Sequence, residues 1–548
     1  MDASANIRKP NAWSGLSPAV RMSADCPATQ SVAKATRTQG KQGKEDKRSK
    51  KRLRASKRCT VQTVSQRDAH LRPVRALCHD PTNVRLRILT LAGLAALLGC
   101  GGSTAARPKG PGDEVGTTTP SSRSTQAAAA DAVDRSPHGT QPGLSAAVPA
   151  GSALSAGPSY LEHTDRLGHV YEQLAGLEEA RAQRDVVILQ YGDSHTASDI
   201  GAGVLRHALQ ARFGDGGRGF VSLGRPWKGY YQEGVHGGMT REFEPAKVTF
   251  SSKGIFAGDG AFGLLGVAVE ASRAGARAWT EVKVSASHVE VAYLEQPQGG
   301  SFDVLVDGVG AGRVGTRAPQ ERSGFFGFDV ADGTHTIEAR PVGDGVVRLF
   351  GLTLDRPEPG VVVDTLGING AQIFTPLRWS EEHFGEQVRH AAPGLVVLAY
   401  GTNEAVEQGL LDADYERRLA ELLERVARAA PGASCLLLGP PDLARRPKGQ
   451  TEWKTWPRVV EIVAMQRRVA EAAGCAFFDQ LAAMGGPGSM AAWAVGPEPR
   501  ARGDRVHLTR AGYTQLATAL ATDLMHGYDE WRAERGLPPS AQKAVASR

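Results

Sequence analysis

Five short apolar runs, most of them flanked by glycine or aspartate, constrain the fold of this chain more than any other feature of its sequence. Their residues do not alternate between apolar and polar types, which is typical of parallel strands buried on both faces. We therefore expect these runs to form a parallel sheet. The runs are Val186–Gln190, Gly360–Asp364, Leu395–Tyr400, Cys435–Leu438 and Cys475–Phe478.

Helical patterns lie between these runs. One helix has a single apolar face and ends before Pro431, and another begins at Pro457 and ends at Gly474. This alternation predicts an α/β fold with a three-layer, doubly wound, flavodoxin-like parallel sheet, whose functional residues follow the carboxyl ends of the strands. The face of the first helix is formed by Tyr415, Leu419, Leu422, Leu423 and Val426.

Polar blocks follow three of the runs, and a fourth lies near the end of the chain. Ser194 stands where a strand turns into a helix, which exposes its hydroxyl and favours an adjacent oxyanion. A serine needs a base to take its proton, and the His507 imidazole suits that role, with Asp504 within reach of its other nitrogen. The blocks are Gly192-Asp193-Ser194-His195-Thr196, Asn369-Gly370, Gly401-Thr402-Asn403-Glu404 and Asp504-Arg505-Val506-His507.

An oxyanion site is also predicted from these blocks. Gly370 lets a backbone N–H approach a substrate, and the Asn403 amide offers a further donor beside the N–H of Ser194. Taken singly, Gly370 also fits a tight turn, Asn403 a loop asparagine and Ser194 a helix cap. Asp504 and His507 alone also fit a helix cap and a surface histidine. Their occurrence together favours catalysis.

Three neighbouring residues have less specific signals. We expect structural roles for Asp193 and His195, as a brace of the first loop and a packed ring respectively. Trp493 fits a pocket wall and a buried core residue equally well.

The four blocks resemble those of the SGNH (GDSL-like) hydrolases, a family named for a Ser, Gly, Asn and His in this order. The resemblance implies a serine esterase with Ser194, Asp504 and His507 as the catalytic triad, an oxyanion hole of Ser194, Gly370 and Asn403, and no cofactor.

Residues 236–355 interrupt the β/α alternation. Strand patterns there are separated by Asp307-Gly308, Asp332-Gly333 and Asp344-Gly345 turns, so we expect an inserted β-sandwich. The insertion resembles the carbohydrate-binding-module-like jelly roll of peptidoglycan O-acetylesterases, whose nucleophile block also reads Gly-Asp-Ser-His-Thr. That resemblance implies an O-acetylated glycan as substrate. The predicted strands are Val289–Leu294, Phe302–Val306, Phe325–Val330, Thr334–Arg340 and Val346–Leu354.

Charge and composition divide the rest of the chain. Residues 1–83 carry 18 Lys and Arg against 6 Asp and Glu, so 47 against 52 remain in residues 84–548. The basic character belongs to an expected disordered tail, and we expect no nucleic-acid partner.

The other expected segments are a signal peptide at 84–100, a flexible linker at 101–157, hydrolase parts at 158–235 and 356–535, and a tail at 536–548.

The segment before Cys100 has the pattern of an export signal. Basic residues precede the apolar stretch Ile88–Leu98, which is too short to span a membrane. Leu97-Leu98-Gly99-Cys100 resembles a bacterial lipobox, which implies lipidation of Cys100 and a membrane-anchored protein of the cell envelope, facing the periplasm or the cell surface. Since such a signal belongs at the start of a chain, we expect translation to begin at Val84.

The cysteines predict no metal site, because none has metal-ligand spacing. Cys435 and Cys475 each begin a predicted strand, and we expect two buried thiols in preference to a disulfide.

Other functions remain compatible with the same residues. An acyl-chain lipase, a thioesterase or an O-acetyltransferase would use the same triad. A surface glycan-binding lipoprotein without catalysis would keep the blocks as scaffold.

Overall fold

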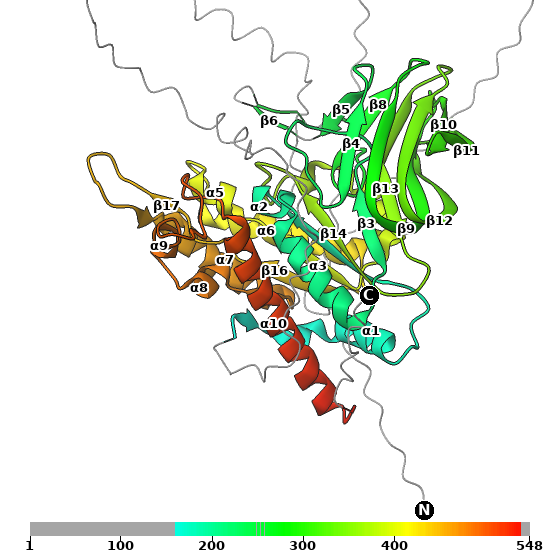
Figure 1. The fold of residues 1–548 in the computed structure, drawn as a ribbon. Coiled ribbons are helices and arrows are strands. Elements are labelled where there is room, and N and C mark those ends of the chain that lie inside the picture. Colours follow the sequence, from blue (N-terminus) through cyan, green and yellow to red (C-terminus); the bar gives the residue numbers. More distant parts are fainter. Residues whose placement is uncertain (1–158, 248, 252–253, 257, 539–548) are drawn as a thin grey trace, which may run out of the picture. The chain divides into compact units, whose positions relative to one another are not determined.

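A six-stranded sheet is the centre of the α/β part of the protein in the computed structural model, which describes residues 159–247, 249–251, 254–256 and 258–538 (Figure 1). When its five parallel strands are numbered one to five along the chain, their order across the sheet is 2-1-3-4-5. A sixth strand, labelled β1, pairs with the edge strand in antiparallel orientation. This is the predicted flavodoxin-like order, with its switch point between β2 and β15. From edge to edge the strands are β1 Leu161–Glu162, β19 Ala476–Phe478, β16 Ser434–Leu438, β15 Leu395–Ala399, β2 Val186–Gly192 and β14 Val361–Gly367.

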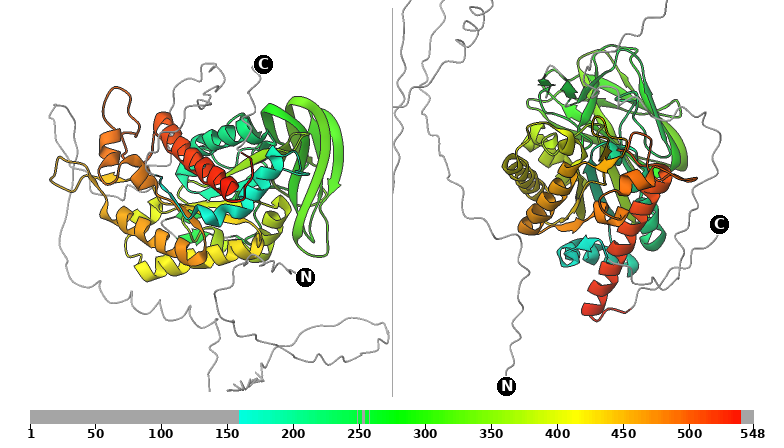
Figure 2. Two further views of the ribbon diagram at one scale, coloured as in Figure 1. Left: turned by 90° about the horizontal axis from the view of Figure 1, so that it is seen from below. Right: turned by 90° about the vertical axis from the view of Figure 1, so that its left-hand side faces the viewer.

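Helices cover both faces of this sheet, which gives the three predicted layers (Figure 2). On one face Ile188 and Val363 pack against α1, α3 and α10, and on the other Leu189 and Val396 pack against α4, α6 and α7. The helices predicted before Pro431 and from Pro457 are confirmed as α6 and α7. The bounds are α1 Gly168–Glu178, α3 Ile200–Phe213, α4 Glu381–Ala391, α6 Asp412–Ala429, α7 Pro457–Ala473 and α10 Arg510–Glu534; the short elements are η3 Thr164–Leu167, α2 Ser194–Ala197, η4 Pro376–Arg378, α5 Thr402–Val406, α8 Gln480–Met484 and α9 Ser489–Trp493.

The inserted region is antiparallel, as expected, and its main strands belong to one nine-stranded sheet. The hydrogen bonding does not confirm a two-sheet jelly roll, because the long strands β9 and β12 curve with the sheet and enclose a core of their own (Figure 1). The strands are β3 Gly217–Val221, β4 Val235–Met239, β5 Glu244–Lys247, β8 Val267–Ala271, β9 Ala278–Glu295, β10 Ser301–Val306, β11 Val309–Gly315, β12 Arg322–Pro341 and β13 Val347–Asp355; β6 Thr249–Ser251 and β7 Gly254–Phe256 form a separate hairpin, as do β17 Ala444–Arg445 and β18 Lys454–Thr455.

One predicted turn in this region is wrong. The two strands expected on either side of Asp332-Gly333 are a single strand, β12, whose pairing with β9 shifts register at this point. The Asp-Gly pair therefore makes an irregularity within the strand instead of reversing the chain. The turn at Asp307-Gly308 is confirmed, because both residues have positive φ and join β10 to β11.

A buried ion-pair cluster joins the nine-stranded sheet to the α/β part of the protein. The Asp199 carboxylate, which precedes α3, accepts hydrogen bonds from Arg206 of α3 at 2.9 Å and from Arg218 of β3 at 2.7 Å. All three side chains are buried. Burial alone would raise the pKa of Asp199, but the two arginine charges, together with hydrogen bonds, lower it to about 2.

The expectation of two free thiols at Cys435 and Cys475 is wrong, because these cysteines form a disulfide. They lie on or beside neighbouring parallel strands, and the register that pairs Leu436 with Ala476 brings the preceding cysteines together. Their Cα atoms are 4.7 Å apart, a distance that a disulfide spans readily.

No helix in the described part of the chain is long and apolar enough to cross a membrane. The predicted basic tail, signal peptide, lipidated Cys100 and linker lie outside the described residues.

A cavity of about 200 Å³ lies between the inserted region and the amino-terminal half of β2 and β14, at the opposite end of these strands from Ser194. Asp185, Asp355 and Asp364 line it. Burial, together with the charge of Asp185, raises the pKa of Asp355 to about 7, and burial raises the pKa values of Asp185 and Asp364 to about 6.

This cavity makes folding stability depend on pH. The folded-state pKa of Asp355 lies above its ordinary value. The contribution of the Asp355 carboxyl to folding stability is therefore complete below about pH 4 and is lost as the pH rises through 7. We predict that Asp355→Asn raises the free energy of unfolding at pH 8 by about 1–2 kcal/mol after solvent screening, and leaves it unchanged at pH 4. Thermal unfolding at the two pH values measures the difference. The exposed Asp165→Asn is the control, and an equal effect of both substitutions would contradict the prediction.

Candidate active site

The structure brings Ser194, His507 and Asp504 together, although 313 positions separate the serine from the histidine. Ser194 Oγ lies 2.9 Å from His507 Nε2, and His507 Nδ1 lies 2.8 Å from Asp504 Oδ2. The imidazole therefore bridges a hydroxyl and a carboxylate, which is the arrangement that activates a serine as a nucleophile.

A tight turn between Ala501 and Leu508 holds the carboxylate and the imidazole in place. Arg505 adopts a left-handed conformation with φ of 61°, and the Arg502 N–H donates to the His507 carbonyl at 2.8 Å. Two backbone N–H groups, those of Val506 and His507, donate to Asp504 Oδ1. Burial alone would raise the pKa of Asp504, but these bonds and the one from the imidazole hold it below its ordinary value, so the carboxylate stays ionised.

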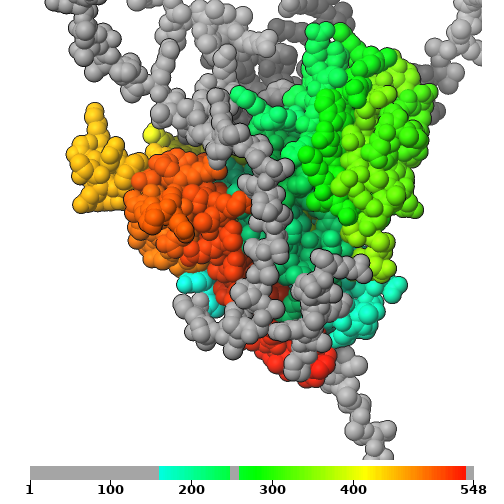
Figure 3. All heavy atoms as spheres, in the orientation of Figure 1, coloured from blue at the N-terminus to red at the C-terminus, as the bar shows by residue number. Residues whose placement is uncertain are grey.

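The β17–β18 hairpin supports this turn from the other side. Ala444 N–H donates to the Arg505 carbonyl at 3.1 Å, and the Arg505 guanidinium lies 5.2 Å from the centre of the Trp453 ring. The loop between β17 and β18 projects from the α/β core (Figures 1 and 3). The side chain of Trp493 is buried in a small hydrophobic cluster with Leu508. Of its two predicted roles, the core residue is therefore the one observed.

Ser194 begins α2, a helix of only four residues. The expected helix dipole is therefore that of a single turn, but the N–H groups of a first helical turn still lack intrahelical acceptors. Close packing fixes this turn against the sheet: a Cβ on Gly192 would lie 2.1 Å from Thr196 Oγ1, and one on Gly367 would lie 2.2 Å from the Ala197 nitrogen. Only glycine fits at these two strand ends.

Asn403 links the nucleophile turn to the Gly370 turn. Its Nδ2 donates to the Ala371 carbonyl at 2.9 Å and makes a longer contact of 3.4 Å to Asp193 Oδ2. Gly370 has φ of 78°, and a Cβ there would meet no atom within 4 Å, so its backbone faces open space. The predicted oxyanion residues Gly370, Ser194 and Asn403 thus lie on the turns that follow three adjacent strands, β14, β2 and β15.

Glu404 is a supporting residue that the sequence did not reveal. Its fully buried carboxyl accepts hydrogen bonds from Ile373 N–H at 2.7 Å and Gly401 N–H at 3.1 Å, which joins the turn after β14 to the turn after β15. Burial raises its pKa to about 8. The sequence signal for this role was the position of Glu404 directly after Asn403. It was not sufficient, because a glutamate in the first turn of a helix is usually an exposed capping residue.

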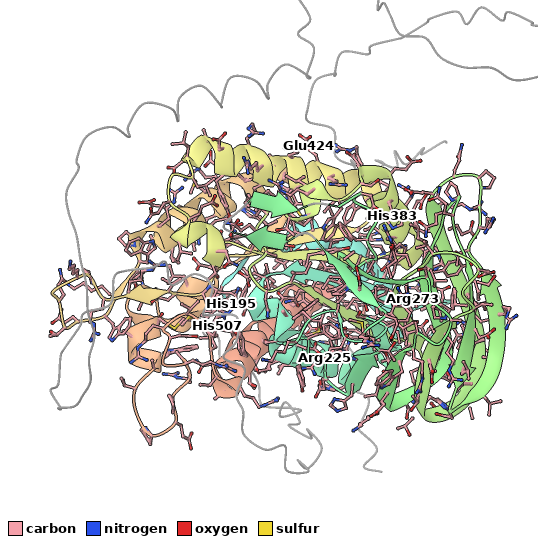
Figure 4. The ribbon with its side chains drawn as sticks, turned by 90° about the horizontal axis from the view of Figure 1, so that it is seen from above. His195, Arg225, Arg273, His383, Glu424 and His507 are labelled. Carbon is pink, nitrogen blue, oxygen red and sulfur yellow. A yellow bond between two sulfur atoms is a disulfide. The ribbon has the colours of Figure 1, made fainter. Side chains whose placement is uncertain are left out.

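Asp193 and His195, the neighbours of the nucleophile, are both tied into the structure. Asp193 caps α2 by accepting from the His195 N–H at 2.9 Å, which agrees with its predicted bracing role. His195 Nδ1 lies 3.0 Å from the Tyr513 hydroxyl, and its ring centre lies 5.4 Å from that of His507 (Figure 4). Burial and the charge of His507 lower the pKa of His195 to about 3, so its ring stays neutral beside the imidazole of the triad.

No group of three or more His, Cys, Asp or Glu among the described residues has the geometry of a metal site. The chemistry open to these side chains is nucleophilic attack by Ser194, with proton transfer through His507.

Comparison with known proteins gives one family and several structures. Residues 331–515 match the GDSL-like Lipase/Acylhydrolase family, a span that contains Gly370, Asn403, Asp504 and His507 but not Ser194. No curated protein matches the chain. Among solved structures, a peptidoglycan O-acetylesterase is 25% identical, with a TM-score of 0.56, and the match covers 68% of this chain and 100% of that chain.

Two carbohydrate esterases are more distantly similar. One is a family 2 enzyme with a carbohydrate binding domain from Corynascus thermopiles (Myceliophthora fergusii), at 12% identity and a TM-score of 0.23, covering 47% of this chain and 95% of that chain. The other is a family two enzyme from Cellvibrio japonicus, at 12% identity and a TM-score of 0.22, covering 54% and 98%.

Proposed function

Since the chain belongs to the GDSL-like hydrolases of the SGNH superfamily, we propose that it is a serine esterase that removes O-acetyl groups from a cell-wall or extracellular polysaccharide. The observation that carries this proposal is the chain of short contacts from Ser194 Oγ through His507 to Asp504. The similarity to a peptidoglycan O-acetylesterase along that enzyme's full length supports the choice of an acetylated glycan.

The first half of the reaction acetylates the enzyme. Ser194 Oγ attacks the acetyl carbonyl carbon while His507 Nε2 accepts the hydroxyl proton. The oxyanion that forms is stabilised by the N–H groups of Ser194 and Gly370 and by the Asn403 amide. The bond to the sugar oxygen then breaks, and His507 gives its proton to that oxygen.

Hydrolysis completes the cycle. His507 accepts a proton from a water molecule, whose oxygen attacks the acetyl carbon of the acyl-enzyme. Acetate leaves as the bond to Ser194 breaks, and the proton returns to the serine oxygen. Asp504 remains ionised throughout and stabilises the imidazolium formed in both halves.

We predict that Ser194→Ala reduces acetate release from O-acetylated peptidoglycan at least about 10³-fold, because the nucleophile is lost while the oxyanion donors remain. Ser198→Ala is the matched control, since the Ser198 hydroxyl donates to the His195 carbonyl and lies outside the triad. Enzymatic acetate measurement gives the rates. More than a tenth of wild-type activity in Ser194→Ala would refute the mechanism.

The same assay separates the alternative functions. A lipase or thioesterase would prefer long-chain esters to acetyl esters, an acetyltransferase would transfer the acetyl group to an added acceptor glycan, and a glycan-binding protein without catalysis would release no acetate.

We predict that Asn403→Ala and Asn403→Asp each lower kcat by about 10²–10³, with a smaller change in KM, because both remove the amide donor to the oxyanion. Asn403→Asp keeps the size of the side chain, so it separates loss of the donor from loss of packing. Steady-state kinetics with p-nitrophenyl acetate provide the measurement. A reduction of less than about fivefold in both variants would exclude Asn403 from the oxyanion hole.

We further propose that the protein is exported and anchored to the cell envelope through Cys100. The disulfide between Cys435 and Cys475 supports an oxidising compartment. We predict that the native protein from a membrane fraction begins at an acylated Cys100 and that Cys100→Ser releases it from the membrane. Mass spectrometry of the N-terminal peptide is the test, and native peptides from residues 1–80 would contradict the proposed start at Val84.

A further inference from the structure

The cavity between the nine-stranded sheet and the amino-terminal half of β2 and β14 lies outside the triad. Aspartates from both parts of the protein line it: Asp185 precedes β2, Asp364 lies in β14, and Asp355 ends β13. We call this feature the aspartate cavity; the residues that define it are Asp185, Asp355, Asp364, His288, Glu290 and Gln387.

Asp355 has the least compensated of these carboxyl groups. Its side chain accepts no hydrogen bond from the described part of the chain, and the adjacent arginine, Arg356, pairs with Asp332 at 2.9 Å. Asp185 and Asp364 lie close enough for their charges to act on Asp355. Three like charges around one cavity are unfavourable unless a cation or a proton compensates them.

The other two aspartates are only partly satisfied. One oxygen of Asp185 accepts a hydrogen bond from the Gly360 N–H at 2.8 Å. One oxygen of Asp364 accepts a hydrogen bond from the Phe220 N–H at 2.7 Å. Burial raises the pKa of Asp364 more than the two arginines bound to Asp199 lower it. The second oxygen of each carboxyl makes no hydrogen bond to a described residue, so it can accept one from a ligand.

The lining contains more acidic groups than basic ones. No lysine or arginine of the described residues lines the aspartate cavity. Its two histidines contact other carboxylates: His288 lies 2.7 Å from Asp329, and His390 lies 2.7 Å from Glu290. The imidazoles therefore leave the three aspartates without a dedicated partner, which favours a cationic ligand.

Gln387 adds a second requirement for the ligand. This residue of α4 lines the cavity and is 3% exposed, and its Nε2 has no hydrogen-bond partner among the described residues. Because a buried donor without an acceptor is costly, we expect the ligand to supply an oxygen. The rings of Phe220 and Phe325 also line the cavity and suit a short carbon chain. A volume of about 200 Å³ corresponds to about six water molecules, so the ligand is small.

We propose that the aspartate cavity binds a small organic ammonium ion that also carries a hydroxyl or carbonyl oxygen, with the ammonium group at the three aspartates and the oxygen at Gln387. A metal ion fits less well, because no group of three acidic or histidine side chains in the described ranges has the geometry of a metal site. The ligand contacts strands of both parts of the protein, so its binding stabilises their arrangement. The site is independent of the proposed esterase function.

The test titrates the full-length protein at pH 8 with ethanolamine, observed by NMR of the ligand. We expect a Kd on the order of 1 mM. Propylamine has the same size and charge but no oxygen, and we expect it to bind about fivefold more weakly. Ethylene glycol keeps the oxygen and lacks the charge, and we expect no binding.

Two variants assign the contacts. Asp355→Asn should weaken ethanolamine binding at least about tenfold, whereas the exposed control Asp165→Asn should leave it unchanged. Gln387→Leu should leave propylamine binding intact and remove the preference for ethanolamine. Thermal unfolding of each variant shows that it is folded.

The affinity should also depend on pH. Burial, with the charge of Asp185, raises the pKa of Asp355 to about 7, and burial raises those of Asp185 and Asp364 to about 6. The three carboxyls therefore ionise between pH 5 and pH 8, while an alkylammonium group, like that of lysine, stays charged. We expect binding at pH 8 to be at least about tenfold tighter than at pH 5. The other titratable groups that face Asp355 are His288 and Glu290 of β9 and His390 of α4.

Several results would overturn the proposal: no ethanolamine binding, equal binding of ethylene glycol, equal losses in both aspartate variants, an affinity that does not change with pH, or tighter binding of calcium ion than of ethanolamine. Competitive inhibition of p-nitrophenyl acetate hydrolysis by ethanolamine would place the amine at the triad and also contradict it. Absence of esterase activity would refute the proposed function and leave the binding result unaffected.

Discussion

The arrangement of the nine-stranded sheet against the α/β part of the protein depends on one constraint, the buried carboxylate of Asp199. It lies five residues after Ser194 and binds Arg206 of α3 and Arg218 of β3, a strand of the nine-stranded sheet. Replacing Asp199 by a neutral residue would leave two buried arginines without the carboxylate they share, which costs far more than an exposed ion pair gains. The same carboxylate accepts a hydrogen bond from the Glu233 N–H, so it also holds the end of the loop between β3 and β4.

The electrostatics of the candidate site separate its ionisable groups into distinct states. Asp504 is kept ionised by donors from its own turn, whereas burial keeps His195 neutral and favours the protonated form of Glu404. A positive charge beside His507 would oppose formation of the imidazolium, so the neutrality of His195 is consistent with proton transfer at the triad. Glu404 contributes through geometry, since it ties together the turns that carry Gly370 and Asn403.

Local pattern was sufficient to predict the sheet, the three strand-end blocks and the block that contains Asp504 and His507. Parallel strands are buried on both faces, so their composition alone identifies them, and topology then brings their carboxyl ends together. The long strand β12 could not be predicted, because Asp332-Gly333 has the composition of a turn and only its pairing with β9 keeps the chain extended. The disulfide was missed for a related reason: it depends on the register of β16 and β19, which local composition does not encode. Glu404 was missed because its burial arises from two loops distant in the chain.

The distance along the chain between nucleophile and base also has a consequence for biosynthesis. Ser194 emerges from the ribosome 313 residues before His507, and the inserted region is made in the interval. The nascent polypeptide therefore has no competent nucleophile until its last tenth has been synthesised and docked against the sheet. Hydrolysis is therefore possible only once the fold is complete. A chain that ends before His507 contains Ser194 but lacks the imidazole that accepts its proton.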